Sequence, residues 1–367
     1  MEGGLSGASV FLLFDAPVNC YIPRVPNNTD VAVYALTRQG LILANRLAAE
    51  LGGVVFASRR IAEGTGVQPF DSLPELVAEN FSRFSGHVFV AAAGIVVRCI
   101  APHLAGKDRD PAVVCLDQEG RFAVSLLSGH LGGANDLAVR CAQAVGGQPV
   151  VTTATDSAGL PSLDVLAASR GLVIGNLDRV KGVNGALLDK QPVQVYDPED
   201  FLGLAEEKLF LPVSHRDDWQ AGEPGVWVSW KEDCPDRDAL RLYPRVLMLG
   251  VGCRRGVGRD EIYSHVVNVF EAAGLSLRSV AGLGSVDVKA DEAGLLEAAA
   301  DLGVEPVFFA KERLDAVDAP NPSGTVMRRM GIGSVSEAAA ILLSKGGSLL
   351  VEKTKTRTVT LAVARRK

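Results

Sequence analysis

The 367-residue sequence has no excess of positive charge, since 37 Lys and Arg stand against 43 Asp and Glu, and the formal net charge is −6. A general nucleic-acid binder needs a basic surface, so the sequence does not indicate this class. Apolar residues make up 47% of the chain, but no uninterrupted run reaches the roughly 18 residues that a membrane-spanning helix requires. We therefore expect neither nucleic acid nor membrane as a partner.

The sequence also has few signs of export or of metal binding. No Lys or Arg precedes the apolar run at 9–14, so we do not expect a secretory signal. The cysteines lack the short paired spacing of a zinc site or of a disulfide framework. They are Cys20, Cys99, Cys115, Cys141, Cys234 and Cys253. These absences predict a cytoplasmic protein with unpaired thiols and without a metal of its own.

The sequence is long and rich in glycine. The chain is too long for one ordinary domain, and its 39 glycines suit the short turns of an α/β protein. Apolar runs of strand length alternate with segments of helical periodicity, which predicts layered α/β units with mostly parallel sheets. We predict an N-terminal α/β domain at 1–135, a middle domain with a trailing linker at 136–243, and a separate C-terminal α/β domain at 244–367.

A few predicted elements are specific enough to test. Leu41, Ala44, Leu47, Ala48 and Leu51 have helical spacing and predict a helix that ends near residue 51. The runs 112–117 and 122–127 flank a polar turn, which indicates a hairpin. Ser334 and Glu337 have the spacing of a capping box and predict a helix start. The runs 348–352 and 358–363 alternate as a terminal strand pair.

The most informative stretch is the turn 128–135, with the sequence Ser-Gly-His-Leu-Gly-Gly-Ala-Asn. It lies between an apolar run and a helical pattern, an arrangement that directs backbone N–H groups at one point in space. The turn therefore predicts a site for a carboxylate or phosphate. The alternative is a tight strand–helix junction whose glycines only permit close packing. Because the motif G-x-x-x-x-G-K-[ST] is absent, neither a nucleotide nor a phosphate ester is the expected ligand.

His130 lies inside this turn and is the side chain best suited to move protons near neutral pH. A capping or packing histidine is an equal alternative. Ser128 is a candidate nucleophile, but the surrounding sequence lacks the G-x-S-x-G pattern, so an N-cap serine fits better.

A second polar cluster ends the apolar run 149–151, and it consists of Thr152, Thr153, Thr155 and Asp156. Open α/β sheets place their ligands at the carboxyl ends of strands, so we favour a functional site over simple turn chemistry. Asp156 is a candidate general base, or the partner that orients His130.

Basic residues form two further candidate sites. Arg98, His103, Lys107 and Arg109 make a local basic stretch in an acidic chain, and they predict an electropositive rim for a polyacidic ligand rather than only a solvated loop. In the last domain, Gly250–Gly256 follows a strand but misses the dinucleotide fingerprint by one residue. Its Arg254 and Arg255 are suited to pair carboxylates bidentately.

Two more segments of the last domain carry polar residues. Lys289, Asp291 and Glu292 lie between a predicted strand and a predicted helix. Here the acidic pair is expected to stabilise the N-terminus of that helix. The turn 321–323 contains Asn321 and Ser323 and is a weaker candidate for a functional site.

Taken together, these stretches resemble the cobalt-precorrin-5A hydrolase family of anaerobic cobalamin biosynthesis. The matching strings are 94–98, 100–102, 107 with 110–114, 127–135, 152–156, 250–256, 289–292, 321–323 and 334–340. The likeness runs from about residue 30 to the end, in the family's order of N-terminal, middle and C-terminal domains. The C-terminal strings also occur in a related stand-alone protein of the aerobic route.

The resemblance implies a substrate and a reaction. The substrate would be a cobalt-bearing, contracted tetrapyrrole with several carboxylates and a δ-lactone on ring A. Water would open the lactone, and the extruded meso carbon would leave with its methyl as acetaldehyde, which gives cobalt-precorrin-5B. Cobalt would come with the substrate, so the enzyme would need no cofactor of its own. Neighbouring enzymes of the pathway would be transient hand-over partners. The alternative is a non-catalytic tetrapyrrole-binding or carrier protein of the same pathway.

Under this hypothesis the site residues have two roles. His130, Asp156 and Ser128 form the catalytic group, with His130 or Asp156 as the base and backbone N–H groups of 129–133 holding the oxyanion. The expected substrate-binding residues are Arg98, Lys107, Gly129, Gly132, Gly133, Asn135, Thr152, Thr153, Thr155, Arg254, Arg255, Lys289, Glu292 and Ser323.

Overall fold

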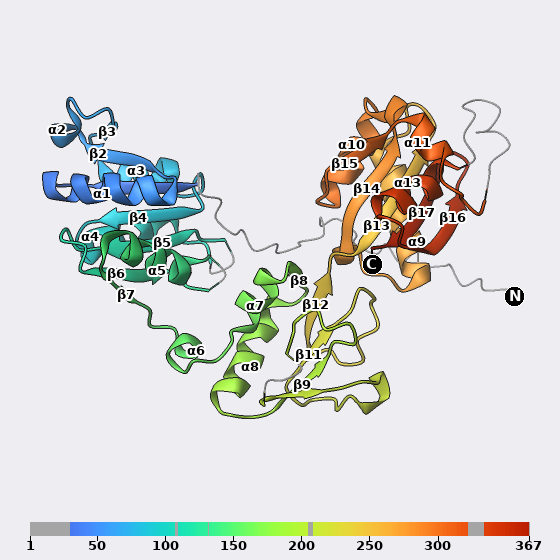
Figure 1. Ribbon diagram of the computed structural model, residues 1–367, viewed down its shortest axis with the longest axis horizontal. Helices are drawn as coiled ribbons and strands as arrows, with labels where there is room; N and C mark the ends of the chain where they lie inside the picture. Colours follow the sequence, from blue (N-terminus) through green and yellow to red (C-terminus); the bar gives the residue numbers. More distant parts are fainter. Residues whose placement is uncertain (1–29, 107–108, 131, 205–207, 322–333, 367) are drawn as a thin grey trace, which may run out of the picture. The chain divides into compact units, whose positions relative to one another are not determined.

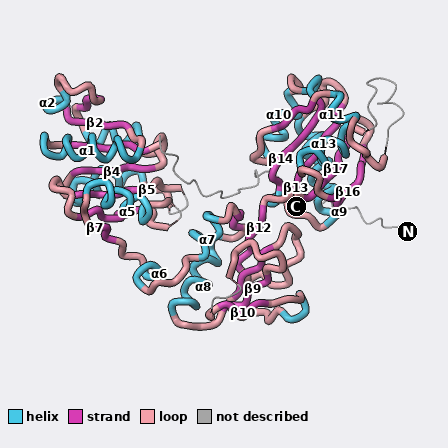
Figure 2. Tube along the Cα trace, in the orientation of Figure 1, coloured by secondary structure: helices cyan, strands magenta, loops and turns pink. Residues whose placement is uncertain are grey.

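The computed structural model describes residues 30–106, 109–130, 132–204, 208–321 and 334–366. The described chain forms two compact units, one of residues 30–229 with 233–244 and one of residues 230–232 with 245–366. The first unit contains a 7-stranded and a 5-stranded sheet, and the second contains one 5-stranded sheet. Helices and strands alternate along both units, as Figure 2 shows. The predicted fold class, layered α/β with a separate C-terminal α/β part, is confirmed.

The first sheet has the strand order β3-β2-β1-β4-β5-β6-β7, and its strands β2 to β7 are labelled in Figure 1. Its strands are β1 (Val31–Ala35), β2 (Val54–Ser58), β3 (Gln68–Phe70), β4 (Gly86–Val90), β5 (Ala112–Leu116), β6 (Phe122–Leu127) and β7 (Gln148–Val150). Strands β1 to β5 are parallel, β6 pairs antiparallel with β5, and β7 is parallel to β6. The predicted hairpin between β5 and β6 is therefore confirmed.

Helices cover both faces of this sheet. They are α1 (Arg38–Leu51), α2 (Arg59–Ala62), α3 (Leu73–Asn80), α4 (Ala93–Ile100) and α5 (Ala134–Val145). Apolar side chains of α1 and α5 share one core with the strands, and those of α3 and α4 share the other. The five predicted apolar positions of α1 are all buried, and its start is capped by the Thr37 side chain, which accepts from Gly40 N.

The reversal of β6 and β7 decides where the candidate site lies. The turn after β6 and the segment after β7 follow carboxyl ends of strands, as predicted. Because these two strands run against β1 to β5, both segments lie at the edge where β4 and β5 begin. The first sheet also continues through α5 and β7, so the boundary expected after residue 135 falls inside this structural part.

The second sheet follows in the same unit and has the order β10-β9-β11-β12-β8. Its strands are β8 (Leu172–Ile174), β9 (Val193–Tyr196), β10 (Phe210–Pro212), β11 (Gly225–Val228) and β12 (Leu240–Pro244). Helices α6 (Ala154–Ser157), α7 (Leu163–Ser169) and α8 (Leu177–Leu188) precede or separate the first of them. Apolar residues of α7 and α8 form the core with one face of this sheet. Strands β10, β11 and β12 lie within 197–244, where the sequence predicts only the trailing linker of a middle domain that ends at residue 243.

The C-terminal unit has the strand order β15-β14-β13-β17-β16. Its elements are β13 (Leu247–Cys253), α9 (Arg259–Ala273), β14 (Val280–Val286), α10 (Ala293–Asp301), β15 (Pro306–Phe309), α11 (Lys311–Asp315), α13 (Val335–Leu343), β16 (Ser348–Lys355) and β17 (Val359–Arg365). Helices α9 and α10 cover one face, and α11 and α13 pack on the other. The predicted terminal strand pair and the helix start at Ser334 are confirmed. A Cβ on Gly250 would lie 1.8 Å from the carbonyl oxygen of Ser336, so α13 packs directly on the backbone of β13.

Candidate functional site

The glycine turn between β6 and α5 is tightly packed. Ser128 adopts a left-handed φ of 57°, and a Cβ on Gly132 would lie 2.3 Å from the Cβ of Ser128. A Cβ on Gly129 would lie 2.7 Å from Oδ1 of Asn135. Gly133 has a φ of 82° and is the N-cap residue of α5. The glycines are therefore needed for close packing, whether or not the turn binds a ligand.

The amides at the start of α5 are partly used within the turn. Gly133 N donates to His130 O at 2.9 Å, Ala134 N to Ser128 O at 3.1 Å, and Asn135 N to Gly129 O at 3.0 Å. These three N–H groups cannot also serve an anion without breaking the turn. The predicted anion cradle therefore depends on the amides of Gly129, His130 and Gly132.

The turn and the segment after β7 meet at His130. Its Nε2 lies 2.9 Å from Oδ2 of Asp156 and 3.1 Å from Oγ1 of Thr155. The His130 side chain is 21% exposed and that of Asp156 is 46% exposed. The structure thus brings together three residues that sequence reasoning chose from two separate motifs.

Asn135 and Thr153 complete the surroundings of Asp156. Nδ2 of Asn135 lies 3.0 Å from both Oγ1 of Thr153 and Oδ2 of Asp156, and the Thr153 hydroxyl donates to the same carboxylate oxygen. Because the Asp156 carboxylate can only accept, the NH₂ of Asn135 must face it, and Oδ1 of Asn135 then accepts from Ser125 Oγ at 2.7 Å. Thr152 is exposed and lies next to this network without joining it through any of these bonds.

The contacts of Asp156 set its protonation state. Partial burial raises the pKa of Asp156, but hydrogen bonds from Thr153, His130 and Asn135, with the positive charge of protonated His130, bring the pKa below its ordinary value. Asp156 is therefore a carboxylate at neutral pH and a weak base. This favours His130 over Asp156 as the group that accepts a proton.

Three residues near His130 were not predicted, and all come from the segment around α7 and α8. Ser162 Oγ lies 3.2 Å from Nδ1 of His130, and Oδ2 of Asp164 lies 3.8 Å from the same nitrogen. Ser162 donates to Oδ1 of Asp164. Nδ2 of Asn184 lies 3.1 Å from Ser162 Oγ and 3.3 Å from Oδ1 of Asp164. In the sequence, Ser162 and Asp164 resemble an ordinary helix start, which gives no signal of a distant histidine.

Ser128 does not fulfil either role proposed for it. The N-cap residue of α5 is Gly133, so the predicted N-cap serine is wrong. The hydroxyl of Ser128 is buried and has no hydrogen-bond partner among the described residues. A serine nucleophile needs a base within hydrogen-bond reach, and the contacts of the His130 ring are made by other hydroxyls.

The predicted basic rim is only partly described. Arg98 is in the last turn of α4, exposed, and its Nη1 donates to the carbonyl of Gly94 at 2.8 Å. Lys107 lies outside the described residues. Asp110 lies just before β5, and its Oδ1 accepts from Ala105 N at 2.8 Å.

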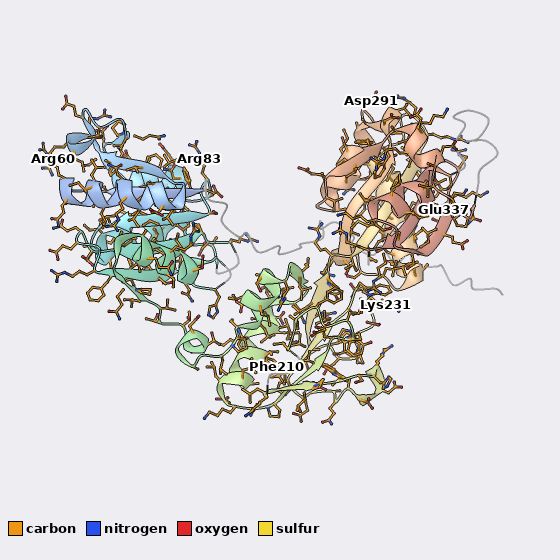
Figure 3. The ribbon with its side chains drawn as sticks, in the orientation of Figure 1. Arg60, Arg83, Phe210, Lys231, Asp291 and Glu337 are labelled. Atoms are coloured by element: carbon orange, nitrogen blue, oxygen red, sulfur yellow. The ribbon has the colours of Figure 1, made fainter. Side chains whose placement is uncertain are left out.

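The C-terminal candidates form a cluster of their own. Nη1 of Arg255 lies 2.8 Å from both carboxylate oxygens of Asp291, and its Nε lies 3.2 Å from Oε1 of Glu292. Figure 3 labels Asp291 on this unit. Lys289 Nζ lies 3.1 Å from the same Glu292 oxygen. Arg255 is therefore already paired with carboxylates of the chain itself, and it meets Asp291 through one nitrogen rather than in the expected two-nitrogen bidentate geometry.

Glu292 ties two loops of this cluster together. Its Oε2 accepts from Gly256 N at 2.9 Å, and its side chain makes no capping bond with α10, although it is the N-cap residue. The hydrogen bond from Gly256 and the charges of Lys289 and Arg255 lower the pKa of Glu292. The carboxylate thus stabilises the loop junction rather than capping α10. Arg254 is exposed beside this cluster, and Ser323 lies outside the described residues.

Comparisons with known proteins cover all three structural parts. The family model described as Cobalamin synthesis G N-terminal matches residues 75–156. The model Cobalamin biosynthesis central region matches 161–244, and Cobalamin synthesis G C-terminus matches 247–364. The gaps between the matches fall between the three sheets.

Curated relatives extend the similarity over nearly the whole chain. A cobalt-precorrin-5A hydrolase of Salmonella typhimurium is 36% identical over 345 residues, covering 91% of this chain and 98% of the relative. A cobalt-precorrin-5A hydrolase of Priestia megaterium is 30% identical over 363 residues, covering 91% and 94%. Protein CobE of a Sinorhizobium species is 29% identical over 121 residues, which is 32% of this chain and 79% of that protein.

Proposed function

The chain belongs to the cobalt-precorrin-5A hydrolase family, and from that premise we propose that it is the enzyme that opens the ring A δ-lactone of cobalt-precorrin-5A. The observation that carries this proposal is the similarity over 91% of the chain, and the family models include the segments that form the His130 site. The products are cobalt-precorrin-5B and acetaldehyde.

The proposed chemistry has two steps and consumes one water. In the first, water attacks the lactone carbonyl, the ring oxygen leaves as the alcohol of the meso carbon, and ring A gains a carboxylate. In the second, the alcohol loses its proton and forms the carbonyl of acetaldehyde as the bond between the meso carbon and the ring breaks. The macrocycle accepts that electron pair and takes up a proton, so no oxidant or reductant is required.

His130 is the proposed base for both steps. Its position beside an ionised Asp156 supports this role, because the carboxylate stabilises the imidazolium that forms when the ring takes a proton. The amides of Gly129, His130 and Gly132 are the proposed donors to the oxyanion of the first step. The glycine turn would then hold the reacting carbonyl next to the base.

The carboxylates of the substrate require positive groups for binding. We propose Arg98, Lys107 and Arg254 for this role, with Arg255 and Lys289 exchanging their present acidic partners for the substrate. Cobalt enters as part of the substrate, and we assign the enzyme no cofactor of its own. None of the described helices is long and apolar enough to cross a membrane.

We place the enzyme in the cytoplasm, with transient hand-over of the macrocycle to neighbouring pathway enzymes. The five cysteines among the described residues are free thiols, as is usual in a reducing compartment.

A second candidate function is a non-catalytic carrier of the same tetrapyrrole. One observation favours it: over 121 residues the chain is also similar to Protein CobE, whose name describes no hydrolase. A carrier would bind the macrocycle and return it unchanged, whereas a hydrolase would release one acetaldehyde for each macrocycle consumed.

One experiment separates these functions. The full chain is incubated without oxygen with cobalt-precorrin-5A in oxygen-18 water, the macrocycle is analysed by mass spectrometry, and acetaldehyde is trapped as a hydrazone. We expect a macrocycle that has lost the two-carbon unit and carries one oxygen-18 in its new carboxylate. Bound but unchanged macrocycle without acetaldehyde would replace the hydrolase proposal with the carrier.

A further inference from the structure

We propose that Asp164, acting through Ser162, holds His130 as the tautomer protonated at Nδ1, so that Nε2 is the nitrogen that exchanges protons with the substrate. The catalytic consequence rests on the proposed function, whereas the tautomer is a property of the free protein. Asp164 and Ser162 are then positioning residues, which act on His130 and do not touch the substrate.

The orientation of the Asn184 amide is fixed by a backbone contact. Its Oδ1 accepts from the backbone N–H of Leu163 at 3.1 Å. Because a backbone N–H can only donate, the oxygen of this amide must face Leu163, and the NH₂ must face Ser162 and Asp164. The distances from Nδ2 are 3.1 Å to Ser162 Oγ and 3.3 Å to Oδ1 of Asp164.

The Ser162 hydroxyl has a single proton, which it can give to only one partner. Ser162 Oγ receives an N–H from Asn184, and it also contacts Oδ1 of Asp164. A carboxylate can only accept, so the hydroxyl proton is directed at Asp164. The oxygen then has no proton for His130, and the remaining contact at 3.2 Å must be donated by Nδ1–H of the ring.

The other ring nitrogen faces different groups. Nε2 lies 3.1 Å from Oγ1 of Thr155, which has a proton to donate, and 2.9 Å from Oδ2 of Asp156, which accepts once Nε2 is protonated. The Asp156 carboxylate can only accept, so its contact is that of the ring protonated on both nitrogens, and Thr155 is the group that can donate to Nε2 once that proton has left. Nε2 is thus the nitrogen whose proton is exchanged, while Nδ1–H stays bonded to Ser162. The groups that face the ring are Thr155 and Asp156 at Nε2, and Ser162 and Asp164 at Nδ1.

Exposure agrees with this division of the ring. The side chain of Asp164 is 7% exposed, against 46% for Asp156. The buried carboxylate therefore lies on the Nδ1 side of the imidazole, and the Nε2 side is open. This arrangement fixes a catalytic histidine in one tautomer. Because α7 and α8 supply Ser162, Asp164 and Asn184, the site is incomplete without the segment that follows the first sheet.

The tautomer is tested in the free protein by nitrogen-15 NMR of labelled histidine, with the His130 signals identified by their loss in His130→Gln. At a pH where His130 is neutral, we expect Nδ1 to have the shift of a protonated nitrogen and Nε2 that of an unprotonated one. In Asp164→Asn, the new amide donates to Ser162, which frees the hydroxyl proton for Nδ1 and favours the Nε2–H tautomer. The control is Asp189→Asn, at the exposed end of α8.

Kinetics give the second readout. We expect Asp164→Asn to lower kcat by about 10- to 100-fold with KM within about twofold, a smaller loss than for a carboxylate bonded directly to the imidazole. Ser162→Ala should show a similar loss, with Ser169→Ala as its control. Asp164→Glu should restore part of kcat, and all variants should keep the wild-type Tm within a few degrees.

Two results would overturn the proposal. One is an Nε2–H tautomer of His130 in the wild-type protein, and the other is an unchanged tautomer in both Asp164→Asn and Ser162→Ala. If the wild type releases no acetaldehyde but shows the expected tautomer shift, the proposed function fails while the positioning of His130 by Asp164 stands.

Discussion

The His130 site and the Arg255 cluster both gather acidic and basic groups at the end of a sheet, but they differ in how these groups are matched. In the C-terminal unit, Arg255 and Lys289 are already paired with Asp291 and Glu292. At His130, the charged partners are two carboxylates on opposite sides of one imidazole. The first arrangement can exchange one carboxylate for another, whereas the second can gain and lose a proton. The comparison suggests binding in the C-terminal unit and chemistry at His130.

The largest effect is expected from His130 itself. We expect His130→Ala to lower kcat by about 10²–10⁴-fold, the usual contribution of a general base, with little change in substrate affinity. The measurement is acetaldehyde release under saturating cobalt-precorrin-5A. His215→Ala, which removes an exposed histidine of the same unit, is the matched control. Full turnover by His130→Ala would break the comparison, because the chemistry would have to lie elsewhere.

Asp156 is expected to have the next largest effect. In Asp156→Asn the imidazolium loses its nearest carboxylate, so we expect kcat to fall by about 10-fold or more with little change in KM. Acetaldehyde release at saturating cobalt-precorrin-5A tests this, with Asp189→Asn as the control. An unchanged kcat would mean that Asp156 does not stabilise the imidazolium.

Arginines of the C-terminal unit should affect binding rather than chemistry. We expect Arg254→Ala to raise KM by several-fold to about 10-fold with kcat unchanged, because only uniform binding is lost. Arg255→Ala should raise KM less, because in the free enzyme this guanidinium is already paired with Asp291. Steady-state kinetics of both variants test this order. A fall in kcat at saturating substrate would place the C-terminal cluster in the chemistry.

The smallest expected effect is the acid sensitivity due to Glu292. Its pKa is below the ordinary value of 4.5 in the folded protein, so it stabilises the fold above that value, and the contribution is lost as the pH falls through the folded pKa. Glu292→Gln should therefore have a lower Tm than the wild type at neutral pH, by about 2–4 °C for each kcal/mol of unfolding free energy that is lost. The difference should shrink below pH 4.5, as thermal unfolding at several pH values would show. A Tm difference that grows toward acid would contradict this account.

Much of the fold could be predicted because it depends on local pattern. Apolar periodicity indicated α1, the hairpin of β5 and β6 and the terminal strand pair. The boundary expected after residue 135 does not match the sheets, because strand pairing of β7 with β6 is a long-range property. Strands β10, β11 and β12 were not predicted for a different reason, because they are short and separated by polar loops, so they leave little periodicity in the sequence.

The candidate site could be predicted only on one side of the imidazole. His130 and Asp156 stand in a glycine turn and at a strand end, which are recognisable in the sequence. Ser162 and Asp164 look like any helix start, and Asn184 lies inside α8. Their contact with His130 depends on how the chain folds back after β7, which no local pattern reports.

The single-turnover rate of acetaldehyde release at saturating cobalt-precorrin-5A, measured side by side for His130→Ala and Arg254→Ala, tests the central comparison most directly. We predict a rate at least about 10²-fold below wild type for His130→Ala and an unchanged rate for Arg254→Ala. An unchanged rate for His130→Ala with a large loss for Arg254→Ala would contradict the account.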